Sequence, residues 1–151
     1  MTERRQAWPL QRCASQFLLC FLLIAGTAPA LALERREQRN VQAIAGQETR
    51  LAAYGTPNEK CEGGPKPTIE LVDRPSHGTL TDKNARIVAE RANVPRRDHP
   101  CLGRFIDAVA VIYVPAAKFR GSDRVRLRVK FDSTQAAPAT TFEEEIFISV
   151  R

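Results

Sequence analysis

The clearest pattern in the chain runs over Arg124-Val-Arg-Leu-Arg-Val-Lys-Phe131, where basic and apolar residues alternate one by one. Successive side chains of a β-strand point to opposite faces, so this alternation predicts a strand with one face in a core and the other in water. The last segment, residues 142–150, alternates in a similar way and places Glu143 and Glu145 on its polar face. A hairpin of the two strands would set an acidic row beside a basic row, which stabilises the pair.

The segment at residues 105–114 is apolar on both of its alternating faces, and only Asp107 interrupts it. A strand that is apolar on both sides is covered on both sides or lies between two other strands. We therefore expect this segment at the centre of a sheet.

Short alternating segments separated by Gly, Pro, Asn and Asp fill the rest of the chain, and no stretch of ten or more residues has a helical period. The predicted strands are residues 41–45, 49–54, 68–73, 78–81, 86–90, 105–114, 124–131 and 142–150. This spacing predicts an all-β fold, an antiparallel β-sandwich of about seven to eight short strands that occupies residues 41–151.

The N-terminus has the features of a secretory signal peptide. Arg4, Arg5 and Arg12 precede an apolar core at residues 17–25, and the small-residue pattern Ala30-Leu31-Ala32 follows. The apolar core is too short for a membrane span, which needs about 20 residues. Residues 1–32 are therefore predicted to be removed on export, which leaves a mature chain without a membrane span.

The mature chain is expected to be mildly basic. Cleavage removes three Arg and one Glu, so the net charge falls from +6 to +4, and 119 of the 151 residues remain. An excess of this size gives little support to a polyanionic partner. Residues 33–40 carry five charges and one apolar side chain. They are predicted to form a flexible N-terminal arm, because the segment has almost nothing to bury.

Two of the four cysteines lie in the predicted signal peptide, and Cys61 and Cys101 remain. A single pair of cysteines in an exported protein predicts one disulfide. The bridge would join a Gly-rich loop to a Pro- and Arg-rich loop. The alternative is a metal site that adds His77 and His99, but these four residues lack the close spacing of zinc ligands.

Two groups of landmarks follow one another in a characteristic order. They are the turn Pro75-Ser-His-Gly78 and the stretch Tyr113-Val-Pro-Ala-Ala-Lys-Phe-Arg-Gly-Ser-Asp123, which leads into the last hairpin. In this order they resemble the bacterial Ig-like, cadherin-like repeat. The resemblance implies an Ig-like sandwich used as a spacer or adhesive module in a surface or secreted protein. Within it, Pro115 is expected to end a strand, Gly121 to permit a positive φ, and Phe119 to cover the core edge.

No catalytic apparatus can be recognised in the sequence. Ser76 and His77 are neighbours, but they lack the Gly-x-Ser-x-Gly context of a nucleophile and fit a turn instead. Glu143 and Glu145 are expected beside arginines, which keep a carboxyl group charged and unsuited to act as a catalytic acid. The sequence therefore predicts a protein that is not an enzyme.

Cofactor signatures are absent from the sequence as well. Neither a phosphate-binding loop nor a dinucleotide fingerprint occurs. Four aspartates lack the Asp-x-Asp spacing of a calcium loop and are predicted to be turn residues; they are Asp73, Asp82, Asp107 and Asp123. We therefore expect no metal and no cofactor.

Two functions are compatible with these observations. The first is an exported, periplasmic or secreted interaction or structural module of the bacterial envelope, whose partner is an envelope protein or glycan rather than nucleic acid. The second is a binder of anionic polysaccharide or lipid phosphate through an Arg-rich surface. Its candidate residues are Arg96, Arg97, Arg124, Arg126 and Arg128. The nearby glutamates and the lack of aromatic residues between these arginines favour the first function, and the sequence leaves the oligomeric state open.

The signal peptide can be tested by mass. In protein exported by bacteria that express the full chain, intact-mass or N-terminal analysis should find a start at Leu33 or within about two residues of it, because Ala30 and Ala32 supply the small residues before the cut. A mature fraction that retains residues 1–32 would contradict the prediction.

Overall fold

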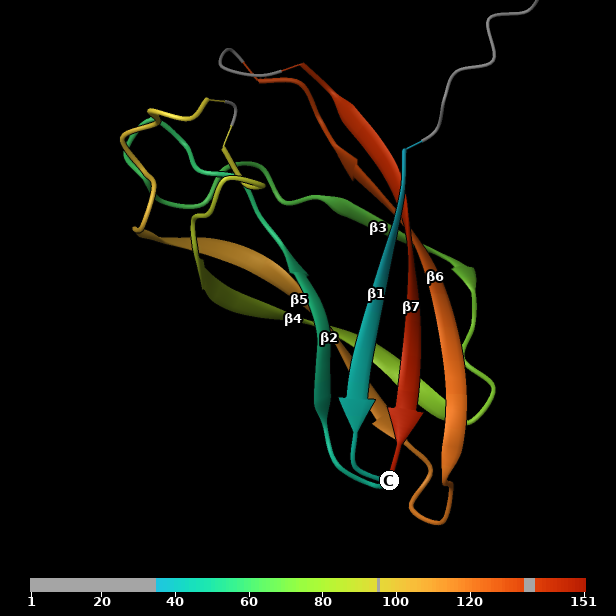
Figure 1. The fold of residues 1–151 in the computed structure, drawn as a ribbon. Coiled ribbons are helices and arrows are strands. Elements are labelled where there is room, and N and C mark those ends of the chain that lie inside the picture. The colour runs from blue at the N-terminus through green and yellow to red at the C-terminus, as the bar shows by residue number, and fades with distance from the viewer. Residues whose placement is uncertain (1–34, 95, 135–137) are drawn as a thin grey trace, which may run out of the picture. The chain divides into compact units, whose positions relative to one another are not determined.

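Seven β-strands make up the described part of the protein, which contains no helix (Figure 1). The computed structural model describes residues 35–94, 96–134 and 138–151, so the predicted signal peptide lies outside the described residues. The strands are β1 (Arg35–Ala43), β2 (Thr49–Tyr54), β3 (Thr68–Asp73), β4 (Gly78–Val88), β5 (Phe105–Pro115), β6 (Gly121–Phe131) and β7 (Thr140–Val150). Within these residue ranges no helix could cross a membrane.

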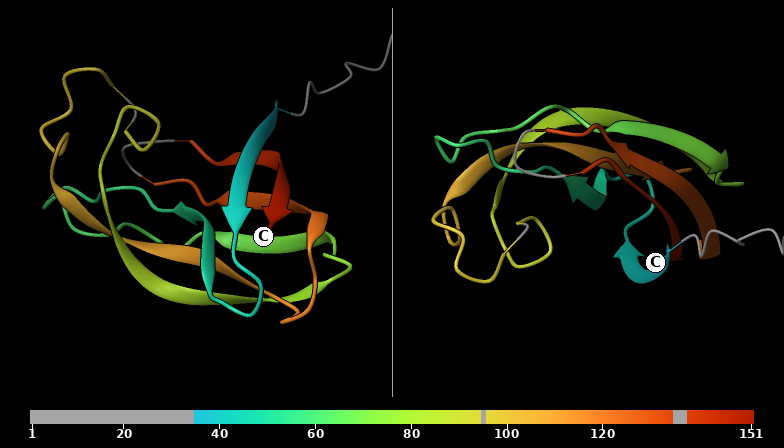
Figure 2. Two further views of the ribbon diagram at one scale, coloured as in Figure 1. Left: turned by 60° about the horizontal axis from the view of Figure 1, so that its bottom comes forward. Right: turned by 90° about the horizontal axis from the view of Figure 1, so that it is seen from above.

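The strands form two sheets that pack against each other as a β-sandwich (Figures 1 and 2). One sheet has four strands in the order β1-β7-β6-β3, and the other has three in the order β2-β5-β4. The predicted all-β sandwich is confirmed. One detail differs, because β1 and β7 run parallel while every other pair is antiparallel. An edge strand added beside the last strand can run in either direction, and the alternation pattern does not encode that choice.

Burial follows the alternation that the sequence predicts. On β6 the apolar residues Val125, Leu127 and Val129 are buried, and the basic residues between them lie on the outer face. On β5 both Ile106 and Tyr113 are fully buried, although they belong to opposite faces. β5 lies between β2 and β4, so the expected central strand is confirmed.

The N-terminal segment departs from the expectation. Residues 33–40 are predicted to be a flexible arm, but residues 35–40 belong to β1, while residues 33 and 34 lie outside the described residues. β1 pairs with β7 along its whole length, from Arg35 opposite Phe142 to Ala43 opposite Val150. Backbone hydrogen bonds to a neighbouring strand can hold an edge strand that has almost no apolar side chains. For this reason the polar composition of residues 33–40 wrongly predicts a flexible arm.

A second departure concerns β4. The sequence predicts separate strands at residues 78–81 and 86–90, whereas the structure has one continuous strand. Asp82, Lys83 and Asn84 suggest a turn because Asp and Asn favour turns. Here all three are exposed on an edge strand, where polar side chains reach water. The four aspartates predicted to lie in turns are likewise all strand residues: Asp73, Asp82, Asp107 and Asp123.

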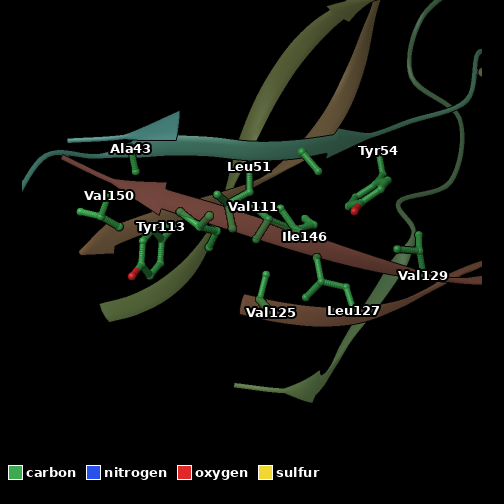
Figure 3. Packing of buried hydrophobic residues seen from close by; sticks show 12 residues of the cluster. Ala43, Leu51, Tyr54, Val111, Tyr113, Val125, Leu127, Val129, Ile146 and Val150 are labelled. Atoms are coloured by element: carbon green, nitrogen blue, oxygen red, sulfur yellow. The ribbon is translucent and has the colours of Figure 1, made fainter. Parts of the chain in front are cut away.

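The two tyrosines of the chain lie in the core, with aliphatic side chains between them (Figure 3). Each tyrosine belongs to the three-stranded sheet, and each donates a hydrogen bond to a buried carboxylate of the four-stranded sheet. The Tyr54 hydroxyl is 2.5 Å from Oε2 of Glu144, and the Tyr113 hydroxyl is 2.7 Å from Oδ2 of Asp123. Two polar bonds therefore cross an otherwise apolar core.

Glu144 occupies the core face of β7, where Phe142 and Ile146 lead one to expect an apolar residue. It is 1% exposed, and its other oxygen accepts a hydrogen bond of 2.6 Å from Nε of Arg39 on β1. Burial and the charge of Glu144 raise the pKa of Tyr54, and the hydrogen bond to Glu144 raises the pKa of Arg39. Because a buried carboxylate is costly without partners, this contact ties β1, β2 and β7 together.

Asp123, at the start of β6, is the second buried carboxylate. Besides Tyr113, it accepts hydrogen bonds from the backbone N–H groups of Ser76, His77 and Arg124, each at 2.9 Å. Burial by itself raises the pKa of Asp123, but the donated hydrogen bonds outweigh burial and hold the pKa below its usual value. These bonds fasten the turn between β3 and β4 to β6.

The turn after β5 has the features expected from its residues. Pro115 is the last residue of β5, Gly121 has a φ of 131°, and Phe119 packs against the core. The ring of His77 stacks on Phe119 with centroids 3.9 Å apart. His77 is thus part of the turn packing.

Replacement of Asp123 should show how much its hydrogen bonds to the turn between β3 and β4 stabilise the fold. We expect Asp123→Asn to lower the free energy of unfolding at neutral pH by roughly 2–3 kcal/mol, because a neutral amide cannot accept all the bonds that the carboxylate accepts. The wild-type advantage should be complete above the ordinary pKa of 3.8 and should shrink as the pH falls towards the lowered folded-state value. Urea unfolding at several pH values measures it. The exposed Asp132→Asn is the control, and a constant difference at all pH values would contradict this account.

Candidate functional site

The basic side chains of β6 form a ladder of ion pairs with acids on both neighbouring strands. On the β7 side, Nη2 of Arg128 is 2.6 Å from Oε1 of Glu143, and Nη1 of Arg124 is 3.2 Å from Oε1 of Glu145. The pairing with Glu143 agrees with the sequence-based expectation. Glu145, which stands opposite Arg126 in register, instead pairs with Arg124.

Acids of β3 complete the ladder on the other side. Nη2 of Arg126 is 2.9 Å from Oδ2 of Asp73, and Lys130 bonds Glu70. The hydrogen bond from Lys130 is the main cause of the lowered pKa of Glu70. Three of the candidate polyanion-binding residues, Arg124, Arg126 and Arg128, therefore already have acidic partners within the fold, as a structural role requires.

The other two candidate residues lie in a different part of the molecule. Arg96 and Arg97 belong to the loop between β4 and β5, whereas the ladder lies on the four-stranded sheet. Nε of Arg96 is 3.8 Å from Oδ1 of Asp98, and both side chains are well exposed. The structure does not place these two arginines in one row with those of β6.

A disulfide joins the loop before β3 to the loop between β4 and β5. Cys61 and Cys101 are bonded, with Cα atoms 5.1 Å apart, as the sequence predicts. His99 accepts a hydrogen bond from the backbone N–H of Cys101 through Nδ1, and His77 lies in the turn packing described above. The four residues do not form a metal site, and no group of three potential ligands occurs among the described residues.

An open surface lies on the inner face of the β4–β5 pair, the face that carries the core residue Tyr113. The pairing is regular, so Val88 and Phe105 stand opposite each other on this same face. Core packing should cover them, yet they are 41% and 59% exposed. Figure 1 shows this end of β4 and β5 diverging from the four-stranded sheet. The sandwich is therefore open at this end.

The exposed end forms what we call the β4–β5 groove. A hollow of ≈ 710 Å³ is lined by residues that include Lys60, Arg86, Arg104, Phe105 and Asp107. A second hollow of ≈ 470 Å³ shares Arg86 and Asp107 with it and continues along β4. The groove thus runs between the loop before β3 and the inner face of β4 and β5.

Charge and aromatic surface meet in this groove. The guanidinium carbon of Arg86 lies 5.6 Å from the ring centroid of Phe105, and Nε of Arg86 is 3.8 Å from Oδ1 of Asp107. Among the described residues the side chains of Lys60 and Arg104 have no ion pair. Such a surface can bind a partner through apolar contact and charge. The described lining residues include no Ser, Thr or free Cys beside a base.

Sequence analysis does not identify the groove. It assigns Phe105 to a strand with two apolar faces, and it uses neither Arg86 nor Val88 as a site residue. The available signal is that Arg86 and Asp107 carry charge on the face that Val111 and Tyr113 assign to the core. Charge alone does not identify an open face, because Glu144 and Asp123 also lie on core faces and are buried, so only the packing of the sheets distinguishes the two cases.

Comparison with known proteins gives no further assignment, because no known protein family, no curated protein and no solved structure matches the chain.

The role of the ladder can be tested by charge exchange. Arg128→Glu should lower the free energy of unfolding by about 1 kcal/mol, because it sets like charges side by side, and adding Glu143→Arg should recover part of the loss. Retention on heparin should change no more than in the control Arg74→Glu, an exposed residue outside the ladder. Loss of retention at unchanged melting temperature would instead indicate a polyanion site.

Proposed function

We propose that the protein is an exported, non-enzymatic Ig-like module of the bacterial envelope that binds a partner through the β4–β5 groove. The observation that carries this proposal is the exposure of Phe105 and Val88 on a face that otherwise belongs to the core. Large apolar side chains grouped on a surface are typical of a contact site. Here Phe105 lies beside cations in a hollow, and Val88 stands opposite it on the same face.

The distribution of strands supports the Ig-like part of the proposal. In an Ig-like sandwich the second, fourth and fifth strands share one sheet, and the third, sixth and seventh share the other. β2, β4 and β5 share one sheet here, and β3, β6 and β7 share the other. β1 departs from that scheme because it pairs with β7. The turn after β5, with Pro115 at the strand end, Phe119 against the core and a positive φ at Gly121, is compatible with the resemblance and supports the proposal.

The disulfide supports export and a preformed groove. A disulfide between Cys61 and Cys101 is stable in an oxidising compartment, such as the periplasm or the cell exterior. It holds the loop that carries Lys60 to the loop that leads into Phe105. The side chain of Asn93 adds a hydrogen bond of 3.2 Å to the carbonyl of Gly55. Because these contacts already fix the loops around the groove, less conformational entropy is lost when a partner binds.

The buried ionisable groups support the non-enzymatic part of the proposal. Glu144 and Asp123 are bonded to tyrosine hydroxyls and to fixed donors inside the core. They contribute to the packing of the two sheets, and neither belongs to the lining of the groove. A catalytic acid or base needs access to a substrate, which these contacts do not provide.

Binding of an anionic polysaccharide or lipid phosphate is the second candidate. The exposed cations of the groove, Lys60, Arg86 and Arg104, favour it more than the paired arginines of β6 do. Retention on heparin that falls steeply with salt and is lost on Arg104→Glu would support this candidate.

Site-specific photo-cross-linking in cells tests the main proposal. A photoreactive amino acid at position 105 should give a covalent adduct in the envelope, whereas the same group at Ser149, on β7, should not. Lys60→Glu should weaken capture at position 105 without a change in melting temperature, because Lys60 lines the groove, is exposed and lies outside β4. Equal capture at both positions, or no capture by correctly exported protein, would contradict a binding role for the groove.

A further inference from the structure

Strand β4 is an edge strand that lacks the short length, the bulges and the proline with which edges are commonly protected against pairing with another chain. It has 11 residues, contains no proline and pairs with β5 without a register shift. The edge strands β2 and β3 have 6 residues each, and both have an irregular register. Short length, bulges and free lysines normally protect an edge. The only lysine of β4, Lys83, is bonded to Glu48 within the chain.

The inner-face residues of β4 are self-complementary in an antiparallel pair. They are Leu80, Asp82, Asn84, Arg86 and Val88. With Asn84 of one copy opposite Asn84 of another, Asp82 stands opposite Arg86 and Leu80 opposite Val88, and each match occurs twice. Directly opposite residues share a face, with Cβ atoms about 4.5–5.5 Å apart, so these matches are real contacts.

The charges select this register among the nearby ones. A pair centred on Asp82 or on Lys83 sets like charges opposite each other. A pair centred on Ala85 places Arg86 opposite the neutral Asn84 and leaves Asp82 without a cation. Asn84 is uncharged, and the Lys66 ammonium group bonded to it belongs to an exposed side chain that can turn into water. Asn84 can therefore meet its own copy at the symmetry axis without repulsion.

The side chains that now contact the polar residues of this face are themselves exposed. Among the described residues Asp82 has no ion pair. Arg86 is 3.8 Å from the exposed Asp107 and lies over the Phe105 ring. Asn84 accepts a hydrogen bond of 2.9 Å from Nζ of the exposed Lys66. Val88 is 41% exposed, and residues 81–84 are all exposed. The free edge of β4 also presents backbone N–H and C=O groups that no strand of the described residues pairs.

We propose that β4 is a self-association edge, at which two copies of the chain pair antiparallel about Asn84 and join their three-stranded sheets into one sheet of six strands. The inference rests on the proposed function as an interaction module and names one of its partners, a second copy. Phe105 lies on β5, one strand inside the paired edge. Capture of a different partner at Phe105 therefore tests the proposed function separately.

Sedimentation analysis of protein purified after expression of the full chain tests the proposal. Wild type should be a dimer at the higher concentrations. Asp82→Arg and Arg86→Asp should each raise the dimer dissociation constant about tenfold or more, because both symmetric pairs become repulsive. The double variant should dimerise again, and an equimolar mixture of the two single variants should form heterodimers. Asp98→Arg and Arg74→Asp are the matched controls and should dimerise like wild type.

A covalent test keeps the proposal falsifiable if a charge variant folds poorly. Asn84→Cys lies on the symmetry axis and should give a disulfide-linked dimer under oxidising conditions, whereas Thr79→Cys, which faces no copy of itself, should not. A wild type that stays monomeric, charge variants that dimerise like wild type, or an Asn84→Cys protein that does not cross-link would overturn the proposal. A monomer that still captures a partner at position 105 would leave the proposed function intact.

Discussion

Two hydrogen bonds between buried tyrosines and buried carboxylates hold the sandwich in one arrangement. Apolar contacts alone tolerate sliding of one sheet over the other, whereas a buried carboxylate is stable only with its donors in place. Tyr54 to Glu144 and Tyr113 to Asp123 join the sheets at two points, with the aliphatic core between them (Figure 3). The same two acids also hold β1 and the turn between β3 and β4.

Charge has different roles on different surfaces. On the outer face of the four-stranded sheet, arginines of β6 are flanked by acids of β3 and β7, so positive charge there contributes to the cohesion of the sheet. In the β4–β5 groove, Lys60 and Arg104 are not committed to such pairs, and Arg86 lies over an exposed aromatic ring. A count of basic residues does not distinguish the two surfaces. The residues next to each base do, because bases with acidic partners stabilise the sheet and bases without them are available to a partner.

The open end and the free edge of β4 have a common origin. β4 and β5 diverge from the four-stranded sheet (Figure 1), so polar and aromatic residues can occupy the inner face that core packing would otherwise require to be aliphatic. The disulfide fixes the loops around this end. The surface proposed for a partner and the edge proposed for a second copy thus lie side by side on the β4–β5 pair.

The sequence by itself determined the β class, the buried apolar face of β6, the central place of β5, the Cys61–Cys101 pairing and the turn after β5. These features follow from local alternation, from breakers and from the two cysteines that lie outside the predicted signal peptide. Only the tertiary structure decided that residues 35–40 form a strand, that Glu144 is buried and that Phe105 is exposed. Each of these depends on contacts between distant segments, such as Arg39 with Glu144, which lie 105 residues apart. A period of two specifies which side chains share a face, but only the packing of the sheets determines whether that face is covered.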